Sequence, residues 1–341
     1  MLKKIKDYIV EVFREEYKFI IFMLLLLIIL NYPLNYYITV GGGISDVSSR
    51  IKVEDKYKSK GTFNISYVTQ LTGNVFTYGL SFIMPNWERE SADNYKYTEE
   101  ESIKDIEFRN ELDLKTANGT ATYWAYTLAN KKLKETSSKI YVIMVDNKQY
   151  KTNLKVQDEI LSVDDKTFSN ITEYKEYIQT KNKGDTVKVK IIRNKKERVI
   201  DCNVYETKGI KLIGVILQVV KEYETAPKVE ITFNKSESGP SGGLITTLEI
   251  YNQLTKKDLT KGMEIAGTGT IETDGTIGQI GGIKYKVLGA EHGKAKYFLA
   301  PSGQNYKDAV KYKKEKKLKI KIIEVKNIKD AINKLEGLKW E

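Results

Sequence analysis

The chain has very few of the residues from which most hydrolase triads, metal sites and disulfides are built. In 341 residues there is one cysteine, Cys202, and one histidine, His292. A single cysteine excludes an internal disulfide, and no cysteine and histidine spacing matches a zinc site. A Ser-His-Asp triad would need His292, and no pattern places its imidazole beside a serine. We therefore expect no metal and no cofactor.

A nucleotide-driven motor is also missing from this sequence. It has no Gly-x4-Gly-Lys-Ser/Thr phosphate loop. The nearest approach, residues 289–295, is one residue short and lacks the hydroxyl that would bind magnesium. We therefore expect chemistry that does not depend on ATP.

Acidic residues are outnumbered, which gives a formal net charge of +11. The densest basic run is 311–319. Such a run can bind a polyanion, but more often it is the exposed face of a helix. We favour an exposed helix face followed by an edge strand, with no nucleic acid partner.

Long apolar runs occur once, near the N-terminus. Residues 19–30 are continuously apolar, and an extension through residue 40 gives 22 residues, enough to cross a bilayer core of about 30 Å. A cleaved signal peptide fits poorly because no small-x-small site follows, and a buried helix of 12 residues is the other alternative. Basic residues are concentrated before the run. The sequence thus predicts a cytoplasmic segment (1–18), a transmembrane signal anchor (19–40) and a linker (41–58). The rest of a single-pass cell-membrane protein would then lie outside the cytoplasm.

One serine occupies an open position at a predicted helix start. The run 239–243, Gly-Pro-Ser-Gly-Gly, precedes residues 244–254, in which apolar side chains recur at helical spacing. Free N–H groups and the positive end of the helix dipole lie at such a start. The backbone N–H groups of Ser241 and Gly242 could therefore stabilise an oxyanion. The alternative is a capped helix after a turn.

A lysine 45 residues downstream can supply the base. After a Gly-Gly break, Ile283, Lys286, Val287 and Ala290 fall on one stripe of a predicted helix, whereas Lys284 falls on another face. A lysine has an ordinary pKa of about 10.4, and lowering it by about three units takes about 4 kcal/mol of desolvation or positive charge. Lys286 faces the core and is the candidate. By itself it could also be one more lysine of a basic chain.

These segments resemble the proteolytic domain of the Lon family. That domain has Gly-Pro-Ser-small-Gly around its nucleophile, and its base is the second lysine of a Gly-Gly-apolar-Lys-Glu-Lys stretch. The resemblance covers about the last 130 residues, including the Gly-rich spacing at 275–282. It implies that Ser241 is the nucleophile, that Lys286 is the base and that Thr268 hydrogen-bonds the lysine. As a whole the chain resembles membrane-anchored, PDZ-containing Lon-like proteases.

Residues 138–206 read as a small α/β unit, and 154–166 resembles the PDZ signature. A PDZ fold binds an extended peptide along a sheet edge. Gln157 replaces the usual glycine, and no Gly-Leu-Gly-Phe-like loop is evident, so a spacer domain is the alternative.

The preceding region predicts further parts of the peptidase. Residues 62–68 and 74–83 alternate like a hairpin around a Thr-Gly turn, and helical patterns follow. We therefore expect an α+β fold with an N-terminal transmembrane helix. Its Lon-type, ribosomal S5 domain 2-like peptidase domain would be discontinuous (59–135 and 208–341), with the PDZ-like domain (138–206) inserted.

The predicted function is that of an ATP-independent serine endopeptidase of the membrane. Its partners would be unfolded or loosely folded extracytoplasmic polypeptides, selected by the PDZ-like domain, and the membrane through the anchor. Self-association is left open. Two alternatives are a non-catalytic peptide-binding adaptor on a Lon-like scaffold and a polyanion-binding surface protein.

Overall fold

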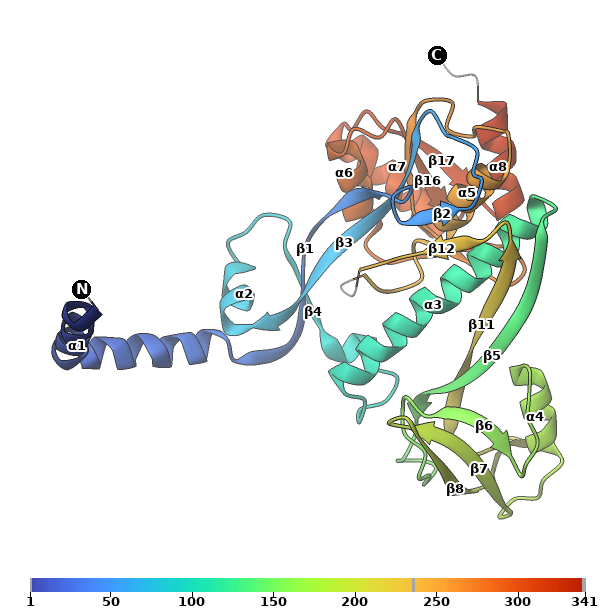
Figure 1. Cartoon of the computed structure of the whole chain (residues 1–341), viewed down its shortest axis with the longest axis horizontal. Coiled ribbons are helices and arrows are strands. Elements are labelled where there is room, and N and C mark those ends of the chain that lie inside the picture. Colours follow the sequence, from blue (N-terminus) through green and yellow to red (C-terminus); the bar gives the residue numbers. More distant parts are fainter. Residues whose placement is uncertain (1, 235–236, 339–341) are drawn as a thin grey trace. The chain divides into compact units, whose positions relative to one another are not determined.

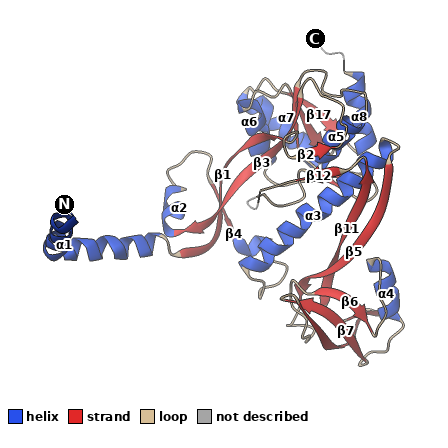
Figure 2. Cartoon of the chain, viewed as in Figure 1, coloured by secondary structure: helices blue, strands red, loops and turns tan. Residues whose placement is uncertain are grey.

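The computed structural model describes residues 2–234 and 237–338, with side chains from residue 14 onward (Figures 1 and 2). Its contacts divide the chain into two compact units. The N-terminal unit consists of Met1–Gly41 and Thr69–Tyr95, and the larger unit of Gly42–Val68 and Lys96–Glu341. Strands β1 (Pro33–Asp46) and β3 (Thr62–Asn74) each have residues in both units.

The N-terminal unit combines helices with an antiparallel strand pair. Besides parts of β1 and β3 it contains helices α1 (Leu2–Leu30) and α2 (Val75–Leu80), strand β4 (Glu88–Ser91) and the 3₁₀ helix η1 (Ala92–Tyr95). Strand β1 pairs with β4 from Tyr36 opposite Ser91 to Thr39 opposite Glu88. Asn74 caps α2, because its side chain accepts a hydrogen bond from the N–H of Thr77.

The prediction of a transmembrane helix over 19–40 is wrong. Helix α1 ends at Leu30, so the apolar run contributes only its 12 residues to the helix, and residues 33–40 belong to strand β1. Across residues 2–234 and 237–338, no helix combines the length and the apolar character that a membrane span needs. This finding also overturns the predicted fold class, which becomes a mixed α/β fold without such a helix. It likewise overturns the predicted location as a single-pass protein of the cell membrane.

The predicted hairpin around residues 72–73 is wrong as well, because β3 is one strand from Thr62 to Asn74. A Cβ added to Gly73 would lie 2.8 Å from the carbonyl oxygen of Tyr36. Glycine therefore permits close backbone approach inside the strand here, and it does not make a turn. The chain turns into α2 immediately afterwards.

The sheet of the larger unit contains parallel strands joined through helices. Its order is β17-β16-β13-β3 with β1 next to β3, and the pairs β17–β16, β16–β13 and β13–β3 are parallel. The strands β13 (Glu264–Gly267), β16 (Tyr297–Pro301) and β17 (Lys321–Val325) belong to this sheet. The same part of the chain also contains the short strand pairs β2 (Ile51–Val53) with β12 (Val229–Ile231) and β14 (Thr270–Ile271) with β15 (Ile277–Gly278), and the helices α5 (Gly243–Leu254), α6 (Ile283–His292), α7 (Gln304–Lys316) and α8 (Ile328–Gly337).

A second sheet has its own core. It has the order β11-β5-β6-β7-β8 and consists of β5 (Lys132–Val145), β6 (Glu159–Val163), β7 (Thr186–Arg193), β8 (Lys196–Asn203) and β11 (Val215–Ala226). Helix α4 (Ile171–Gln179) and the strand pair β9 (Tyr205–Thr207) with β10 (Ile210–Leu212) lie in the same stretch of chain. Its apolar cluster uses residues 140–219 only. The main cluster instead joins residues 47–65 and 121–133 to residues 229–338. The main cluster thus receives residues from both before and after the segment that forms the cluster of the second sheet.

Helix α3 (Ile103–Leu128) lies between these two cores. Near its start, Leu112 packs with Ile143 and Val220 on the β5–β11 ladder, along which the helix runs in Figure 1. Near its end, Ala121 and Ala125 belong to the main cluster. One helix therefore packs on both parts of the larger unit.

Candidate active site

Ser241 lies at the start of α5, as the sequence predicts. Helix α5 begins at Gly243 after Gly242 as N-cap, and all of its residues are buried. A Cβ added to Gly243 would lie 2.9 Å from the backbone N of Ile271, so only glycine fits where the helix enters the core. The buried helix holds Ser241 at its end, where the serine remains partly exposed.

Lys286 lies on the buried face of α6. The helix starts at Ile283 after Gly282, whose φ of 70° is left-handed and suits glycine. Lys286 is 3 % exposed, whereas Lys284 is exposed. The prediction that Lys286 faces the core is confirmed.

The two side chains meet. Lys286 Nζ lies 2.9 Å from Ser241 Oγ and 3.0 Å from Thr268 Oγ1. The Thr268 hydroxyl donates its only proton to the carbonyl oxygen of Ser241 at 3.1 Å, so its oxygen must accept from the amine. A neutral amine that donates to Thr268 can turn its lone pair toward the hydroxyl of Ser241. This geometry suits proton transfer from serine to lysine.

Burial favours the neutral form of the Lys286 amine, which is the form that can accept a proton. It lowers the pKa of Lys286 from 10.5 to about 7, because the charged form loses its hydration. The amine is thus neutral in a large fraction of molecules at neutral pH. A base is most effective when its pKa lies near the working pH.

Hydrogen-bond donors lie beside the serine. The carbonyl of Ser241 accepts a hydrogen bond from the N–H of Gly269 at 2.8 Å, and the N–H of Gly243 donates to Pro240. Within the described ranges, the N–H groups of Ser241 and Gly242 have no acceptor. They are the donors that the sequence analysis assigned to an oxyanion, and they stay candidates for that role.

The other candidates from the sequence lie away from the dyad. His292 is exposed at the end of α6, and in the described part of the chain only Lys286 lies within hydrogen-bond distance of Ser241 Oγ. Cys202 is buried. The basic run lies largely on the exposed face of α7 before the edge strand β17. Among the described residues, no cluster of three or more histidine, cysteine, aspartate or glutamate side chains could hold a metal.

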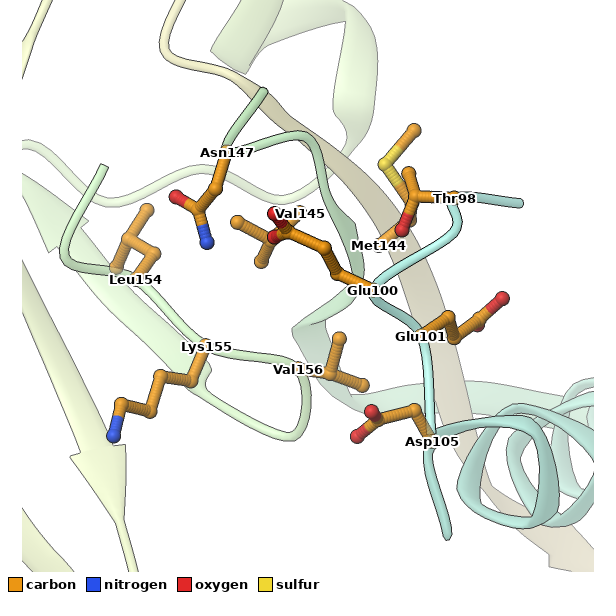
Figure 3. Close-up of a pocket in the computed structure, with 10 residues that line it drawn as sticks. All are labelled: Thr98, Glu100, Glu101, Asp105, Met144, Val145, Asn147, Leu154, Lys155 and Val156. Carbon is orange, nitrogen blue, oxygen red and sulfur yellow. The ribbon is translucent and has the colours of Figure 1, made fainter. Parts of the chain in front are cut away.

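A cavity of about 280 Å³ lies elsewhere in the larger unit (Figure 3). Residues 98–105 before and within α3 form one wall, and residues 144–147 and 154–156 the other. Three acidic residues from 98–105 line the first wall, and the charge of one of them is balanced because Glu101 pairs with the buried Arg109. Neither Ser241 nor Lys286 lines this cavity.

A glycine loop before the edge strand of the second sheet is not among the features predicted from the sequence. Strand β11 is an edge strand that pairs only with β5 among the described strands, and α4 contacts it. Gly214 precedes β11 with a φ of 77°, and a Cβ there would lie 2.6 Å from Tyr150 Cβ. An isolated glycine between apolar residues at a strand start is the sequence signal that could have found this loop.

Comparisons with known proteins place two families on these parts of the chain. Residues 232–336 match the Lon protease (S16) C-terminal proteolytic domain, and residues 128–204 match a PDZ domain. The Lon protease of Trichlorobacter lovleyi is 34 % identical over 96 residues, which are 28 % of this chain and 11 % of that protein. The Lon protease of aster yellows witches'-broom phytoplasma is 31 % identical over 99 residues, 29 % of this chain and 12 % of that protein. The matched part thus spans about a tenth of these relatives.

Among solved structures, the PDZ domain of an SdrC-like protein from Listeria monocytogenes is 29 % identical, with a TM-score of 0.23 over 25 % of this chain and 92 % of that chain. A corresponding PDZ domain from Listeria innocua is 28 % identical, with a TM-score of 0.22 over 23 % of this chain and 92 % of that chain. By the family models, residues 232–336 are similar to the Lon proteolytic domain and residues 128–204 to a PDZ domain, and the Lon matches support a serine peptidase.

Proposed function

We propose that the protein is a serine endopeptidase that uses Ser241 as nucleophile and Lys286 as general base. The observation that carries the proposal is the 2.9 Å separation of Lys286 Nζ from Ser241 Oγ, with the lysine almost fully buried. A buried lysine without a partner of opposite charge is expensive for the fold. A role in proton transfer accounts for its presence beside a partly exposed serine.

The proposed steps use this geometry. Ser241 Oγ attacks a peptide carbonyl while its proton passes to Lys286 Nζ. The free N–H groups of Ser241 and Gly242 stabilise the developing oxyanion. The protonated amine then donates its proton to the leaving nitrogen, and an acyl-enzyme remains. In the second half, Lys286 takes a proton from the water that attacks the ester, and it returns this proton to Ser241 Oγ as the acid product leaves. Thr268 keeps the amine oriented throughout.

Polypeptides are the proposed substrates, and the PDZ segment is the proposed site of their selection. Strand β11 is the terminal strand of its sheet, and an extended chain could add beside it as a further strand. The chain contains no phosphate loop, so we propose hydrolysis without ATP. Unfolded or loosely folded chains are then the suitable substrates, because stably folded domains would have to be unfolded first.

The two separate apolar clusters support one further proposal about organisation. Residues 138–206 would form a PDZ domain inserted into a peptidase domain that continues on either side of it. Helix α3 would then belong to the peptidase and pack on the insert.

Active-site labelling tests the function. A fluorophosphonate probe should modify Ser241 of the full chain, with the adduct located by mass, and casein should be cleaved with or without ATP. Ser241→Ala and Lys286→Ala should abolish both reactions, a loss of roughly 10²–10⁴-fold for the base alone. Lys284→Ala, two residues away and exposed, is the matched control and should keep most activity. An unlabelled Ser241 in a folded wild-type protein would leave a non-catalytic peptide-binding protein as the better account.

A further inference from the structure

The main-chain carbonyl of Lys286 is held by a side chain that the dyad itself does not explain. Ser66 in β3 is fully buried (0 % exposed) and donates its hydroxyl proton to this carbonyl oxygen at 2.7 Å. The carbonyl of Gly43 lies farther from the same hydroxyl, at 3.4 Å. A hydroxyl has one proton to give. Ser66 therefore fastens α6 to the sheet at the residue that carries the amine.

One helical turn later, α6 touches the backbone of β1. A Cβ added to Gly289 would lie 2.7 Å from the N of Gly43 and 2.9 Å from the carbonyl carbon of Gly42. The neighbouring atoms are backbone and cannot move aside as a flexible side chain does. Only glycine at 289 lets the helix lie this close to the strand. This close approach is called the glycine contact below.

We propose that Ser66 and the glycine contact of Gly42, Gly43 and Gly289 are positioning elements for the base. They hold α6 at the depth at which Lys286 Nζ reaches Ser241 Oγ and stays out of water. Residues 286 and 289 are three apart and so lie on the same face of the helix. The hydrogen bond and the glycine contact thus fix that face against the sheet at two points. The consequence for hydrolysis rests on the proposed function, but the effect on the amine does not.

A small outward movement of α6 should change both the position of the Lys286 amine and its exposure to water. Carbon atoms pack at roughly 3.5–4.0 Å, so an alanine at 289 would push the helix out by roughly 1 Å. A misplacement of about 1 Å can lower a rate by about 10²-fold. It would also admit water to an amine whose pKa is low because of burial alone. The groups that face the amine are the hydroxyls of Ser241 and Thr268, and no charged side chain among the described residues contributes to the shift.

The test uses two variants and two matched controls in the full chain. Ser66→Ala removes the hydroxyl, and Gly289→Ala opens the helix contact. Thr122→Val is the control for the first, because Thr122 is also a buried hydroxyl that donates to a backbone carbonyl, at 2.9 Å in α3. Gly337→Ala is the control for the second, since a Cβ at this helical glycine meets nothing within 4 Å.

Two readouts separate the proposal from a general loss of stability. The midpoint at which Lys286 titrates is measured by NMR with ¹³C-labelled lysine, assigned with Lys286→Arg, and the rate of Ser241 labelling is measured from pH 6 to 10. In Ser66→Ala and Gly289→Ala the midpoint should rise by at least about one unit, so that the neutral fraction at pH 7 falls from about half to about a tenth. Labelling at pH 7 should fall about fivefold or more and recover toward pH 9. The controls should leave both readouts unchanged.

Each outcome decides a separate question. Unchanged midpoints in both variants would overturn the positioning role, whatever happens to stability. If Gly289→Ala does not fold, the midpoint measured in Ser66→Ala alone decides whether the positioning role holds. If wild-type Ser241 takes no label while the midpoints still move, the proposed function fails and the positioning role stands.

Discussion

Replacement of Lys286 by methionine is expected to stabilise the protein near neutral pH while it removes activity. Methionine has a similar unbranched shape and carries no charge. Lys286 is 3 % exposed, and burial lowers its pKa from 10.5 to about 7. The folded protein therefore holds an amine that loses its proton far more easily than it does in the unfolded chain.

The direction and size of the effect follow from proton linkage. Between pH 7 and 10.5 the unfolded chain binds one more proton at Lys286 than the folded chain, so the stability of the wild type rises with pH in this window. A shift of roughly 3.5 units corresponds to about 5 kcal/mol over the whole window, of which about 2 kcal/mol falls between pH 7 and 9. The variant has no such slope. Loss of the hydrogen bond to Thr268 removes about 1 kcal/mol from its advantage. We expect Lys286→Met to be more stable than the wild type by roughly 3 kcal/mol at pH 7 and by about 1 kcal/mol at pH 9.

Urea unfolding followed by tryptophan fluorescence measures this difference. Trp124 packs against the main apolar cluster, and residues 138–206 contain no tryptophan. With Trp87 and Trp340 replaced by phenylalanine in all variants, the remaining signal reports on the part that holds the dyad. Lys284→Met is the control, because Lys284 is exposed, and its unfolding free energy should stay close to that of the wild type at both pH values. An advantage of Lys286→Met that is equal at pH 7 and pH 9 would refute the reasoning, since the amine would then not titrate in this window.

Two further predictions concern single contacts. Thr268→Val removes the acceptor that orients the amine and should lower the rate of Ser241 labelling roughly tenfold, whereas Thr268→Ser keeps a hydroxyl and should stay close to the wild type; equal losses in both would contradict the orienting role. Asp158→Ala leaves Arg193 and the N–H of Lys155 without their buried carboxylate and should cost the second sheet roughly 3 kcal/mol. Hydrogen exchange should then speed up in β6–β8 and stay unchanged in α5 and α6, and Asp201→Ala, an exposed aspartate of β8, should have no effect.

The elements that carry the dyad could be predicted because their signals are local. Residues 244–254 and 283–290 each show helical periodicity directly after a glycine break, and the helices begin at Gly243 and Ile283. The same periodicity separates Lys286 from Lys284, because residues two apart on a helix face different directions. Burial of one lysine and exposure of the other then follow from the sequence alone.

What the sequence could not provide depends on partners far along the chain. Residues 33–40 follow the apolar run in the sequence, and only their pairing with neighbouring strands shows that they form a strand. In the sequence Gly73 resembles a turn residue, and only its close contact with the backbone of Tyr36 explains a glycine inside the strand. Ser66 lies 220 residues from the carbonyl that it binds. A hydropathy pattern reports the preferences of a segment, whereas these choices are made by tertiary contacts.

The parallel sheet accounts for the burial that would let Lys286 act as the proposed base. The chain has 56 lysine and arginine residues, yet Lys286 is the only lysine that the structure buries among its described residues. Its burial depends on a glycine break that starts α6 and on a sheet against which the helix packs closely. Elsewhere in this basic chain a lysine beside Ser241 would stay hydrated and protonated, and it could not accept a proton. The proposed base and the tight packing of α6 are therefore one feature, since the protonation of the amine depends on the water that the packing excludes.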